Sequence, residues 1–350
     1  MKVFLFILDG CASSEFESAN TPFLDEISKA GEYTLECEAI FPTATYTGHS
    51  TIITGNYPEK HGMIGNQFWD RKYKCIRNFD FFNPNDNIES PTIFELLPFP
   101  SCAISEPVTK GAKMVIEKQI FDKITLENQN QSVFNHLTTK LSSDIQFYMI
   151  NFLGVDGFGE SAGPNSKKYL QCLEEVDELI MKIKNQIKTD FVFIVTADHG
   201  MTIVKENINL EEKLRNDGFD VKCMASHRCS HIYAESDLEA LERHLQSLNF
   251  IDKIFDRGKI EEVHLAHERT GDIVVCAKIG YEFGDMKLNG SHGGATQAEI
   301  LVPFIIYDSK NRLTGKVSLE SMKLVDICPT ILDLFNIKLN LQFQGKSLLI

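Results

Sequence analysis

Strand-like apolar runs alternate with amphipathic segments along this chain of 350 residues. The runs occupy residues 2–8, 35–41, 145–153, 191–197 and 300–307. From residue 170 to residue 187 the apolar residues recur every three or four positions, which predicts an amphipathic helix with Ser166 as its N-cap. Residues 321–336 predict a last helix. Because strands alternate with helices, the pattern predicts an α/β fold in which helices cover a mostly parallel sheet.

The pattern changes between residues 203 and 288, where the apolar runs are shorter. A run at 273–279 and a helix-like stretch at 238–248 stand out in this region. We therefore expect a smaller α+β subdomain at 203–288, inserted into a catalytic core made of residues 1–202 and 289–350.

Charge and composition narrow the range of partners. A formal net charge of -14 at pH 7 argues against polymeric nucleic acid, which needs basic residues to displace counterions from its phosphates. No apolar run reaches the roughly 18 residues that span a bilayer, and the apolar start before Asp9 is too short for a signal-peptide core. Nine cysteines without C-x-x-C spacing are typical of reduced thiols. We expect a cytoplasmic monomer or homodimer without membrane contact.

Acidic residues and histidines stand near the ends of several predicted strands. Asp9 follows the first run, Asp156 the third, Asp198 and His199 the fourth, and His292 comes shortly before the fifth. In an open α/β sheet, ligands collect outside the carboxyl ends of the strands. Carboxylates and imidazoles at four such places predict a binuclear metal site.

The segment at 42–55 carries a candidate nucleophile. It reads Pro-Thr-Ala-Thr-Tyr-Thr-Gly-His-Ser-Thr-Ile-Ile-Thr-Gly, in which Thr45 falls where a helix would begin and Gly55 where it would end. A hydroxyl at a helix N-terminus, beside free backbone N–H groups, is well placed to hold a phosphoryl group. A bound divalent cation would activate that hydroxyl as a nucleophile.

Together these motifs resemble the alkaline phosphatase superfamily, in its type I phosphodiesterase (nucleotide pyrophosphatase/phosphodiesterase) branch, close to phosphonoacetate hydrolase. The matching motifs occur in the family's order: Leu-Asp-Gly, Pro-Thr-x-Thr, His-Gly-Met-Ile-Gly-Asn, Val-Asp-Gly-Phe-Gly-Glu, Ala-Asp-His-Gly and Gly-Ser-His-Gly-Gly. They cover roughly residues 1–70, 145–202 and 267–350. The resemblance implies a three-layer α/β/α sandwich with a mostly parallel central sheet. It also implies that Thr45 is the nucleophile and that Asn66 binds a phosphoryl oxygen.

The resemblance further implies two ligand sets for divalent ions. Asp9, Thr45, Asp198 and His199 would hold one ion, and Asp156, the residue four positions later and His292 would hold the other. The family has a histidine at that middle position, whereas this chain has Glu160. We expect Zn²⁺, with Mn²⁺ or Fe²⁺ as alternatives at the second site, because a carboxylate favours harder ions. Alternatively, Glu160 turns away and His227 or His231 takes its place.

Other polar and aromatic residues have simpler interpretations. A capped helix explains His49 and a tight turn explains His61. Four further histidines are expected at the surface or in the core: His136, His244, His264 and His267. The aromatic residues at 68–69 and 79–82 favour core positions over a substrate wall.

The motifs predict a two-metal phosphohydrolase that cleaves a small phosphodiester, nucleotide pyrophosphate or phosphonate through a covalent phosphothreonine intermediate. The alternatives are a C–P bond hydrolase similar to phosphonoacetate hydrolase, a metal-dependent phosphomutase and a non-catalytic binding protein. In phosphonoacetate hydrolases two lysines grip the substrate carboxylate, and Lys110 and Lys113 have a similar but shifted spacing here. Residues 67–144 and 203–288 are expected to form the substrate wall.

Overall fold

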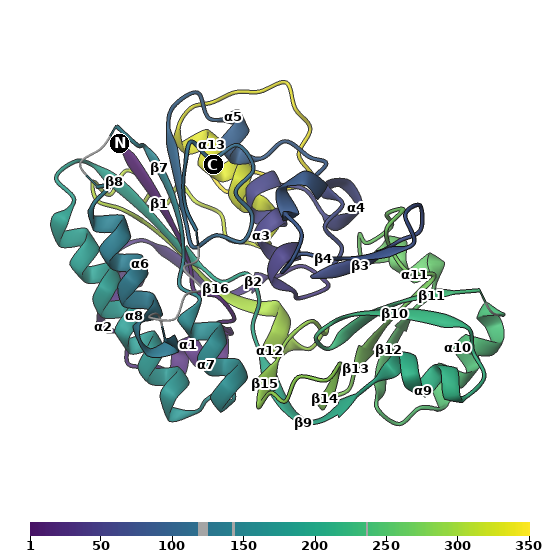
Figure 1. Cartoon of the computed structure of the whole chain (residues 1–350). Coiled ribbons are helices and arrows are strands. Elements are labelled where there is room, and N and C mark those ends of the chain that lie inside the picture. Colours follow the sequence, from purple (N-terminus) through teal and green to yellow (C-terminus); the bar gives the residue numbers. More distant parts are fainter. Residues whose placement is uncertain (118–124, 142–143, 236) are drawn as a thin grey trace.

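A seven-stranded mixed sheet organises the computed structural model, which describes residues 1–117, 125–141, 144–235 and 237–350 (Figure 1). In order across the sheet, the strands are β2 (Glu32–Glu38), β16 (Leu301–Asp308), β8 (Phe191–Thr196), β1 (Lys2–Ile7), β7 (Phe147–Asn151), β5 (Ser101–Ile104) and β6 (Met114–Ile116). Strand β16 runs antiparallel to both neighbours, and all other neighbouring pairs are parallel. The predicted mostly parallel sheet is confirmed.

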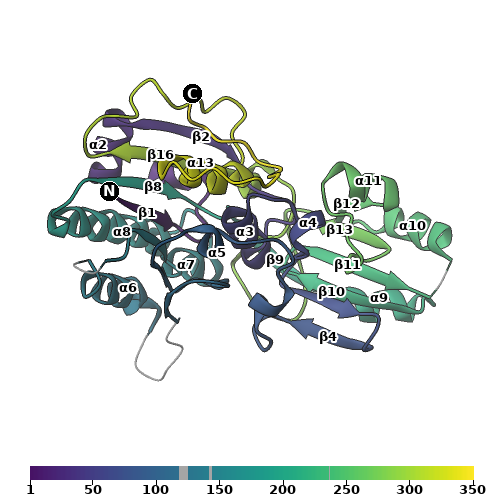
Figure 2. The same cartoon turned by 90° about the horizontal axis from the view of Figure 1, so that it is seen from above.

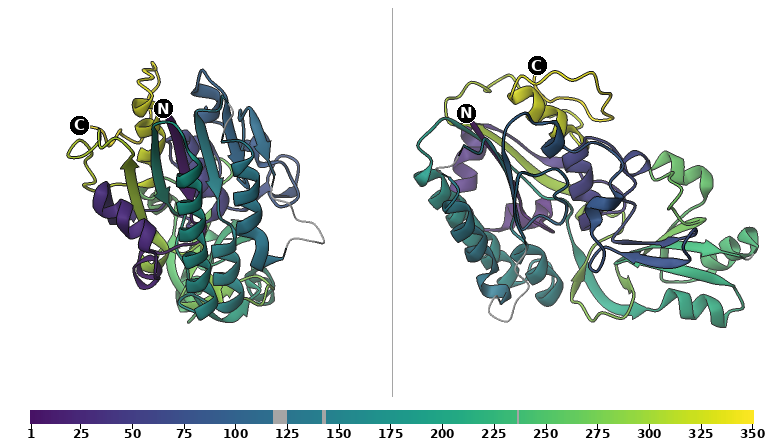
Figure 3. Two further views of the ribbon diagram at one scale, coloured as in Figure 1. Left: turned by 90° about the vertical axis from the view of Figure 1, so that its left-hand side faces the viewer. Right: turned by 45° about the horizontal axis from the view of Figure 1, so that its top comes forward.

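Helices cover both faces of this sheet (Figures 1 and 3). On one face lie α1 (Ser13–Ser18), α2 (Pro22–Ala30), α6 (Gln129–Thr138), α7 (Gly154–Ala162) and α8 (Lys167–Gln186). On the other lie α3 (Thr45–Thr54), α5 (Ile93–Leu96) and α13 (Ile327–Leu334). The three layers of the predicted α/β/α sandwich are therefore present.

Local signals account for the bounds of two predicted helices. The side chain of Ser166 accepts a hydrogen bond from the Tyr169 N–H, so the predicted N-cap of α8 is confirmed. The predicted helix at 321–336 is shorter, a 3₁₀ turn (Leu324–Asp326) followed by α13. Ser321 and Asn336 adopt left-handed φ values of 53° and 55°, which bound the helical segment on both sides.

The central strands β1, β7 and β8 are buried almost throughout. Strands that are covered on both faces need apolar side chains on both, which explains their continuous apolar runs. Because the three strands are parallel neighbours, their carboxyl ends meet at one edge of the sheet.

A second group of strands lies beyond that edge (Figures 1 and 2). It contains a four-stranded antiparallel sheet of β10 (Val221–Ser226), β11 (Cys229–Ala234), β13 (Ile273–Ala277) and β12 (Ile251–Phe255), with α9 (Leu210–Asn216), α10 (Leu238–Ser247) and α11 (Arg257–Glu262). A three-stranded sheet joins β14 (Gly280–Phe283), β9 (Thr202–Ile208) and β15 (Gly290–Ser291). A separate hydrophobic cluster that includes Leu241 and Val275 fills this part. The cluster supports a subdomain at 203–288, whose bounds stay a prediction.

Short elements complete the described chain. They are the hairpin β3 (Gln67–Asp70) and β4 (Cys75–Asn78), the helices α4 (Pro58–His61) and α12 (Gln297–Ile300), and 3₁₀ turns at Pro84–Asn87 and Leu126–Asn128. Seven of the nine cysteines are buried. Within the described ranges, we find no helix with the length and apolar character needed to cross a membrane.

Candidate active site

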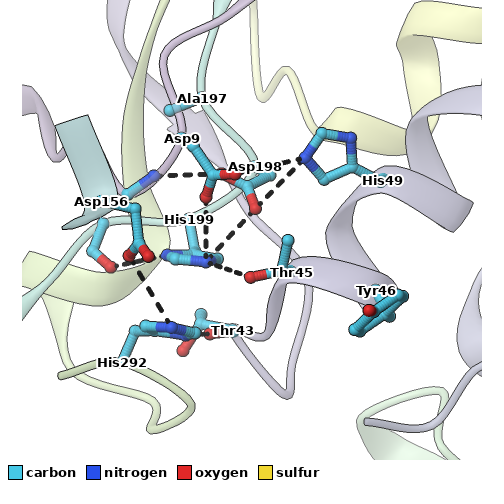
Figure 4. Close-up of polar contacts among 12 residues, drawn as sticks. Asp9, Thr43, Thr45, Tyr46, His49, Asp156, Ala197, Asp198, His199 and His292 are labelled. Carbon is cyan, nitrogen blue, oxygen red and sulfur yellow. Dashed lines mark hydrogen bonds and ion pairs between the residues drawn. The ribbon is translucent and has the colours of Figure 1, made fainter. Parts of the chain in front are cut away.

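The ends of β1 and β8 bring four of the predicted residues together (Figure 4). Asp9 follows β1, Asp198 and His199 follow β8, and Thr45 comes from the first turn of α3. His199 Nε2 lies 3.2 Å from both Asp198 Oδ2 and Thr45 Oγ1. It lies 3.8 Å from Asp9 Oδ1. These four side chains form one cluster.

Helix α3 places the Thr45 hydroxyl at this cluster. Ala44 is extended, Thr45 is the first helical residue, and Gly55 ends the helix in the left-handed region with φ 63°. The predicted bounds of this helix are confirmed. A Cβ at Gly48 would lie 2.8 Å from the carbonyl oxygen of Asp198, so glycine is required where α3 packs against the loop after β8.

Each of the two aspartates in the cluster has one buried oxygen without a hydrogen bond within the described residues. Asp9 Oδ2 accepts from the Asn151 side-chain amide at 2.7 Å, and Asp198 Oδ1 accepts from the Gly10 N–H at 3.2 Å. The other oxygens, Asp9 Oδ1 and Asp198 Oδ2, are buried and find no hydrogen-bond partner within the described residues. Burial raises the pKa of each aspartate to about 6, and the charge of Asp198 adds to the shift at Asp9.

A second cluster adjoins the first. The His292 ring stacks on the His199 ring with centroids 3.7 Å apart. His292 Nε2 lies 3.8 Å from Oδ1 of Asp156, which stands in the first turn of α7. His292 follows the short strand β15 and therefore reaches the site from outside the central sheet.

Both histidines present the same nitrogen to the carboxylates. Nδ1 of His199 lies 3.0 Å from the Gly200 carbonyl oxygen, and Nδ1 of His292 lies 2.8 Å from that of Thr43. When Nδ1 donates to a carbonyl, the lone pair is on Nε2. Burial lowers the pKa of His199 to about 4 and that of His292 well below its ordinary range, so both rings are held neutral.

Glu160 occupies the position where the resemblance implied a histidine. It stands one helical turn after Asp156 on α7, and its Oε1 lies 3.8 Å from His227 Nδ1. His231 is engaged elsewhere, since Nε2 bonds to the Ile64 carbonyl at 2.9 Å and Nδ1 accepts from the Gly271 N–H at 3.3 Å. Of the two alternative histidines, only His227 lies at the site.

These residues fit two divalent cations. Three groups have ligand atoms that all lie within 4.8 Å of one another: Asp9, Asp198 and His199; Asp156, His199 and His292; and Glu160, His227 and His292. Buried carboxylate oxygens, and the neutral imidazoles of His199 and His292 with unprotonated Nε2 atoms, are the ligands that such ions take. The identity of the ions stays a prediction.

Residues 3–298 match the sequence profile of the Type I phosphodiesterase / nucleotide pyrophosphatase family. The chain belongs to this family. It is 26% identical over 220 residues to ectonucleotide pyrophosphatase/phosphodiesterase family member 1 of Homo sapiens, covering 56% of this chain and 23% of that protein. It is also 26% identical over 317 residues to ectonucleotide pyrophosphatase/phosphodiesterase 1 of Saccharomyces cerevisiae, covering 73% of this chain and 40% of that protein. The chain thus spans less than half the length of either curated relative.

Solved structures share the fold over nearly the whole chain. Murine ectonucleotide pyrophosphatase/phosphodiesterase 5 superposes with a TM-score of 0.80 at 20% identity, covering 99% of this chain and 98% of that one. Phosphonoacetate hydrolase from Sinorhizobium meliloti, solved with phosphonoformate, gives a TM-score of 0.73 at 18% identity over 94% of both chains. The architecture is therefore alkaline phosphatase-like.

In this family member, a pocket of about 440 Å³ opens over Thr45. Its wall includes Tyr46 and Phe79 as well as six carboxylates, at Asp9, Asp80, Glu106, Glu117, Asp156 and Glu160. No lysine or arginine is among the described residues that line it. Lys110, for example, donates from Nζ to the Ile88 carbonyl at 2.9 Å. The pocket is therefore acidic apart from any bound cations.

Asn66 also lines this pocket. Its Oδ1 accepts from the Tyr46 N–H at 3.4 Å, and its own N–H donates to Ser226 Oγ at 2.8 Å. Because Oδ1 is the accepting atom, the side-chain NH₂ group is the one left to donate to a ligand.

Sequence reasoning missed a buried histidine–carboxylate pair behind the aspartates. His49 Nδ1 lies 2.7 Å from Glu106 Oε2. His49 Nε2 lies 3.5 Å from Asp198 Oδ2 (Figure 4). Burial lowers the pKa of His49, but the charge and hydrogen bond of Glu106 and the charges of Asp198 and Asp9 together outweigh it and raise the pKa to about 9. A signal did exist, since His49 is one helical turn after Thr45 and so shares its face of α3. A capped helix does not fully explain this residue.

The other histidines lie outside the pocket wall. His61 is buried, with Nε2 3.0 Å from Thr51 Oγ1 and Nδ1 accepting from the Met63 N–H, as expected for a tight turn. The remaining four are His136, His244, His264 and His267, none of which lines the pocket.

The aromatic residues divide between core and surface. Phe68 and Phe79 are buried, as predicted, although Phe79 also borders the pocket. The core prediction is wrong for Phe81 and Phe82, which are exposed. They lie at the surface in the loop after β4, and Phe82 packs against the Arg77 guanidinium.

Proposed function

We propose that this chain hydrolyses a small phosphodiester, nucleotide pyrophosphate or phosphonate through a covalent phosphothreonine intermediate. The observation that carries the proposal is the position of Thr45 Oγ1. It lies 3.2 Å from His199 Nε2, at the N-terminus of α3, and borders the pocket. A hydroxyl beside free helical N–H groups and unsatisfied carboxylates is suited to phosphoryl transfer.

In the first step, the Thr45 hydroxyl loses its proton to solvent, a bond from Oγ1 to phosphorus forms, and the leaving group departs with the electron pair of its bond to phosphorus. Donors from the first turn of α3 and the side-chain NH₂ of Asn66 stabilise the charge on the equatorial oxygens. In the second step, water attacks phosphorus and the Oγ1–phosphorus bond breaks, which restores Thr45.

The ligand sets would complete this arrangement. Asp9, Thr45, Asp198 and His199 would hold one divalent cation, and Asp156, Glu160 and His292 would hold the other. Such a pair of cations neutralises charge on the attacking and leaving oxygens and activates the hydroxyl. Zn²⁺ is the expected ion, with Mn²⁺ or Fe²⁺ as alternatives at the second site.

The pocket favours a monoanionic substrate. A phosphomonoester dianion needs a cationic group for its additional charge, and the lining residues include six carboxylates without a lysine or arginine. The formal net charge of -14 disfavours polymeric nucleic acid. We therefore propose a small diester or pyrophosphate as the substrate class, in a cytoplasmic protein with reduced thiols.

Two findings on other proteins bear on the choice between a nucleotide-containing substrate and a phosphonate. An inactive variant of murine ectonucleotide pyrophosphatase/phosphodiesterase 5 was solved with AMP, which supports a nucleotide-containing substrate here. Phosphonoacetate hydrolase has a similar fold and was also solved with phosphonoacetate, which keeps a phosphonate as the second candidate. Lys110 and Lys113 do not line the pocket, so these two lysines are not placed to bind a substrate carboxylate there.

Steady-state kinetics with a p-nitrophenyl phosphodiester and with p-nitrophenyl phosphate test the proposal. We expect the diester to give the higher kcat/KM, Thr45→Ala to remove turnover, and Thr45→Ser to retain part of it. Thr139→Ala, at an exposed threonine, serves as the control. A tenfold preference for the monoester, roughly 1.4 kcal/mol of transition-state binding, would contradict the substrate class. Near-native turnover by Thr45→Ala would contradict the covalent mechanism.

A further inference from the structure

His227 reaches the active site from the second group of strands. It lies in the turn between β10 and β11, with a left-handed φ of 57°. Its ring packs against the His292 ring with centroids 4.1 Å apart, and it lines the pocket over Thr45. A left-handed conformation is uncommon outside glycine and is often kept where a side chain must be aimed at a site.

Two carboxylates flank the His227 ring. Nδ1 lies 3.2 Å from Glu282 Oε1 and 3.8 Å from Glu160 Oε1. Glu282, on β14, is buried, and its Oε2 has no hydrogen-bond partner within the described residues. An ordinary core histidine is satisfied by one acceptor. His227 instead stands between an acidic side chain of the catalytic core and one of the second group of strands.

The spacing suits a shared cation. Two ligand atoms that are each ~2.1 Å from a tetrahedral ion lie ~3.4 Å apart. Because Glu282 Oε1 lies 3.2 Å from His227 Nδ1, that nitrogen donates to the carboxylate, and Nε2 is the ring atom left for an ion. The 3.8 Å between His292 Nε2 and Asp156 Oδ1 is close to the expected ligand spacing. One ligand atom each from Glu160, His227 and His292 also lies within 4.8 Å of the others, so these residues can reach a single ion.

We propose that His227 is a fourth protein ligand of the second metal site, which compensates for the glutamate at position 160, with Glu282 as its buried positioning residue. The inference rests on the proposed function, because it presupposes an ion held by Asp156 and His292. With His227 the site has two carboxylates and two imidazoles. Such a mixed set suits a five- or six-coordinate ion such as Mn²⁺ or Fe²⁺, which still leaves a position for substrate oxygen.

Metal titration of the chelator-treated full chain tests this ligand. We expect wild-type protein to bind two Mn²⁺ ions by isothermal titration calorimetry. His227→Ala should bind the ion of the first site with wild-type affinity and the ion of the second site roughly 100-fold more weakly. A loss of this size is expected because even residues that only hydrogen-bond to a metal ligand contribute about 10–100-fold to metal affinity. Glu282→Gln should weaken that same ion by ~10-fold. His136→Ala, at a histidine remote from the pocket, is the matched control and should bind both ions normally.

The outcomes separate the two proposals. If wild-type protein binds only one ion, the two-metal function is wrong. If wild-type protein binds two ions and His227→Ala binds both with unchanged affinity, only the ligand role of His227 is overturned. Mn²⁺ electron spin echo spectra of the loaded wild-type protein give an independent readout that needs no variant. Coupling of one ion to two histidine nitrogens is expected, and coupling of both ions to only one nitrogen each would overturn the inference.

Discussion

Replacing Arg228 with methionine should destabilise the protein strongly, because it leaves the charge of Glu299 buried without a counterion. Both side chains are fully buried, and Arg228 Nη1 lies 2.7 Å from Glu299 Oε2. Removing one partner of a buried ion pair costs about 3–5 kcal/mol. Arg228 also donates to the carbonyl oxygens of Ala277 and Tyr281, at 2.7 and 3.2 Å, and methionine would remove both bonds.

The remaining partners of Glu299 place the expected cost near the lower end of that range. Glu299 still accepts from the Gly294 N–H at 2.8 Å and from the Thr296 hydroxyl at 2.6 Å. We therefore expect Arg228→Met to cost about 3 kcal/mol, which corresponds to a fall in Tm of ~6 °C at ~2 °C per kcal/mol. Because Arg228 adjoins His227 and Gly294 is two residues from His292, the second metal site should weaken as well.

Thermal unfolding of metal-free protein by differential scanning calorimetry measures this cost. Arg243→Met is the matched control, since Arg243 is 69% exposed and pairs with Glu239 at 3.8 Å, a surface contact worth less than about 1 kcal/mol. The double variant Arg228→Met/Glu299→Gln removes both charges and should recover part of the loss. If Arg228→Met lowers stability no more than Arg243→Met, the reasoning from an uncompensated buried charge is refuted.

Two further predictions concern Glu160 and His61. Glu160→His should shift metal preference toward Zn²⁺ in competition titrations against Mn²⁺, because an imidazole replaces a harder carboxylate, and an unchanged preference would count against a ligand role for Glu160. Burial lowers the pKa of His61 from 6.5 to about 3, so the stability that neutral His61 contributes is complete above pH 6.5 and is lost as the pH falls toward 3. Urea unfolding should show that the loss of stability between pH 7 and pH 5 is about 2 kcal/mol smaller in His61→Gln than in wild-type protein, and an equal loss in both would contradict this.

Features that depend on local pattern were predictable from the sequence. The runs that became β1, β7 and β8 are apolar at most positions because both faces are covered, and strand ends then locate Asp9, Asp198 and His199. The bounds of α3 follow from a threonine and a glycine in positions that start and stop helices. The order of the motifs identified the family that the comparison of residues 3–298 confirmed.

The sequence left open the contacts that form between distant segments. His227 and His231 are four residues apart and equally plausible as substitutes, but in the folded chain only His227 turns toward Glu160, while Ile64 and Gly271 hold His231. The spacing of Lys110 and Lys113 resembles that of the lysine pair in phosphonoacetate hydrolases. In the folded chain, however, Lys110 bonds to the Ile88 carbonyl and does not line the pocket.

The pairing of His49 with Glu106 likewise joins α3 to the loop after β5. The spacing of apolar residues along the chain does not predict this contact. Local pattern reports which face of an element is buried. The packing of the layers decides which charged residue lies beside a buried imidazole. A buried charge needs an opposite charge nearby in space, and the two residues can be far apart in the sequence. The strand ends and the helix start of the site were therefore determined by the sequence alone, and the partners around them only by the tertiary structure.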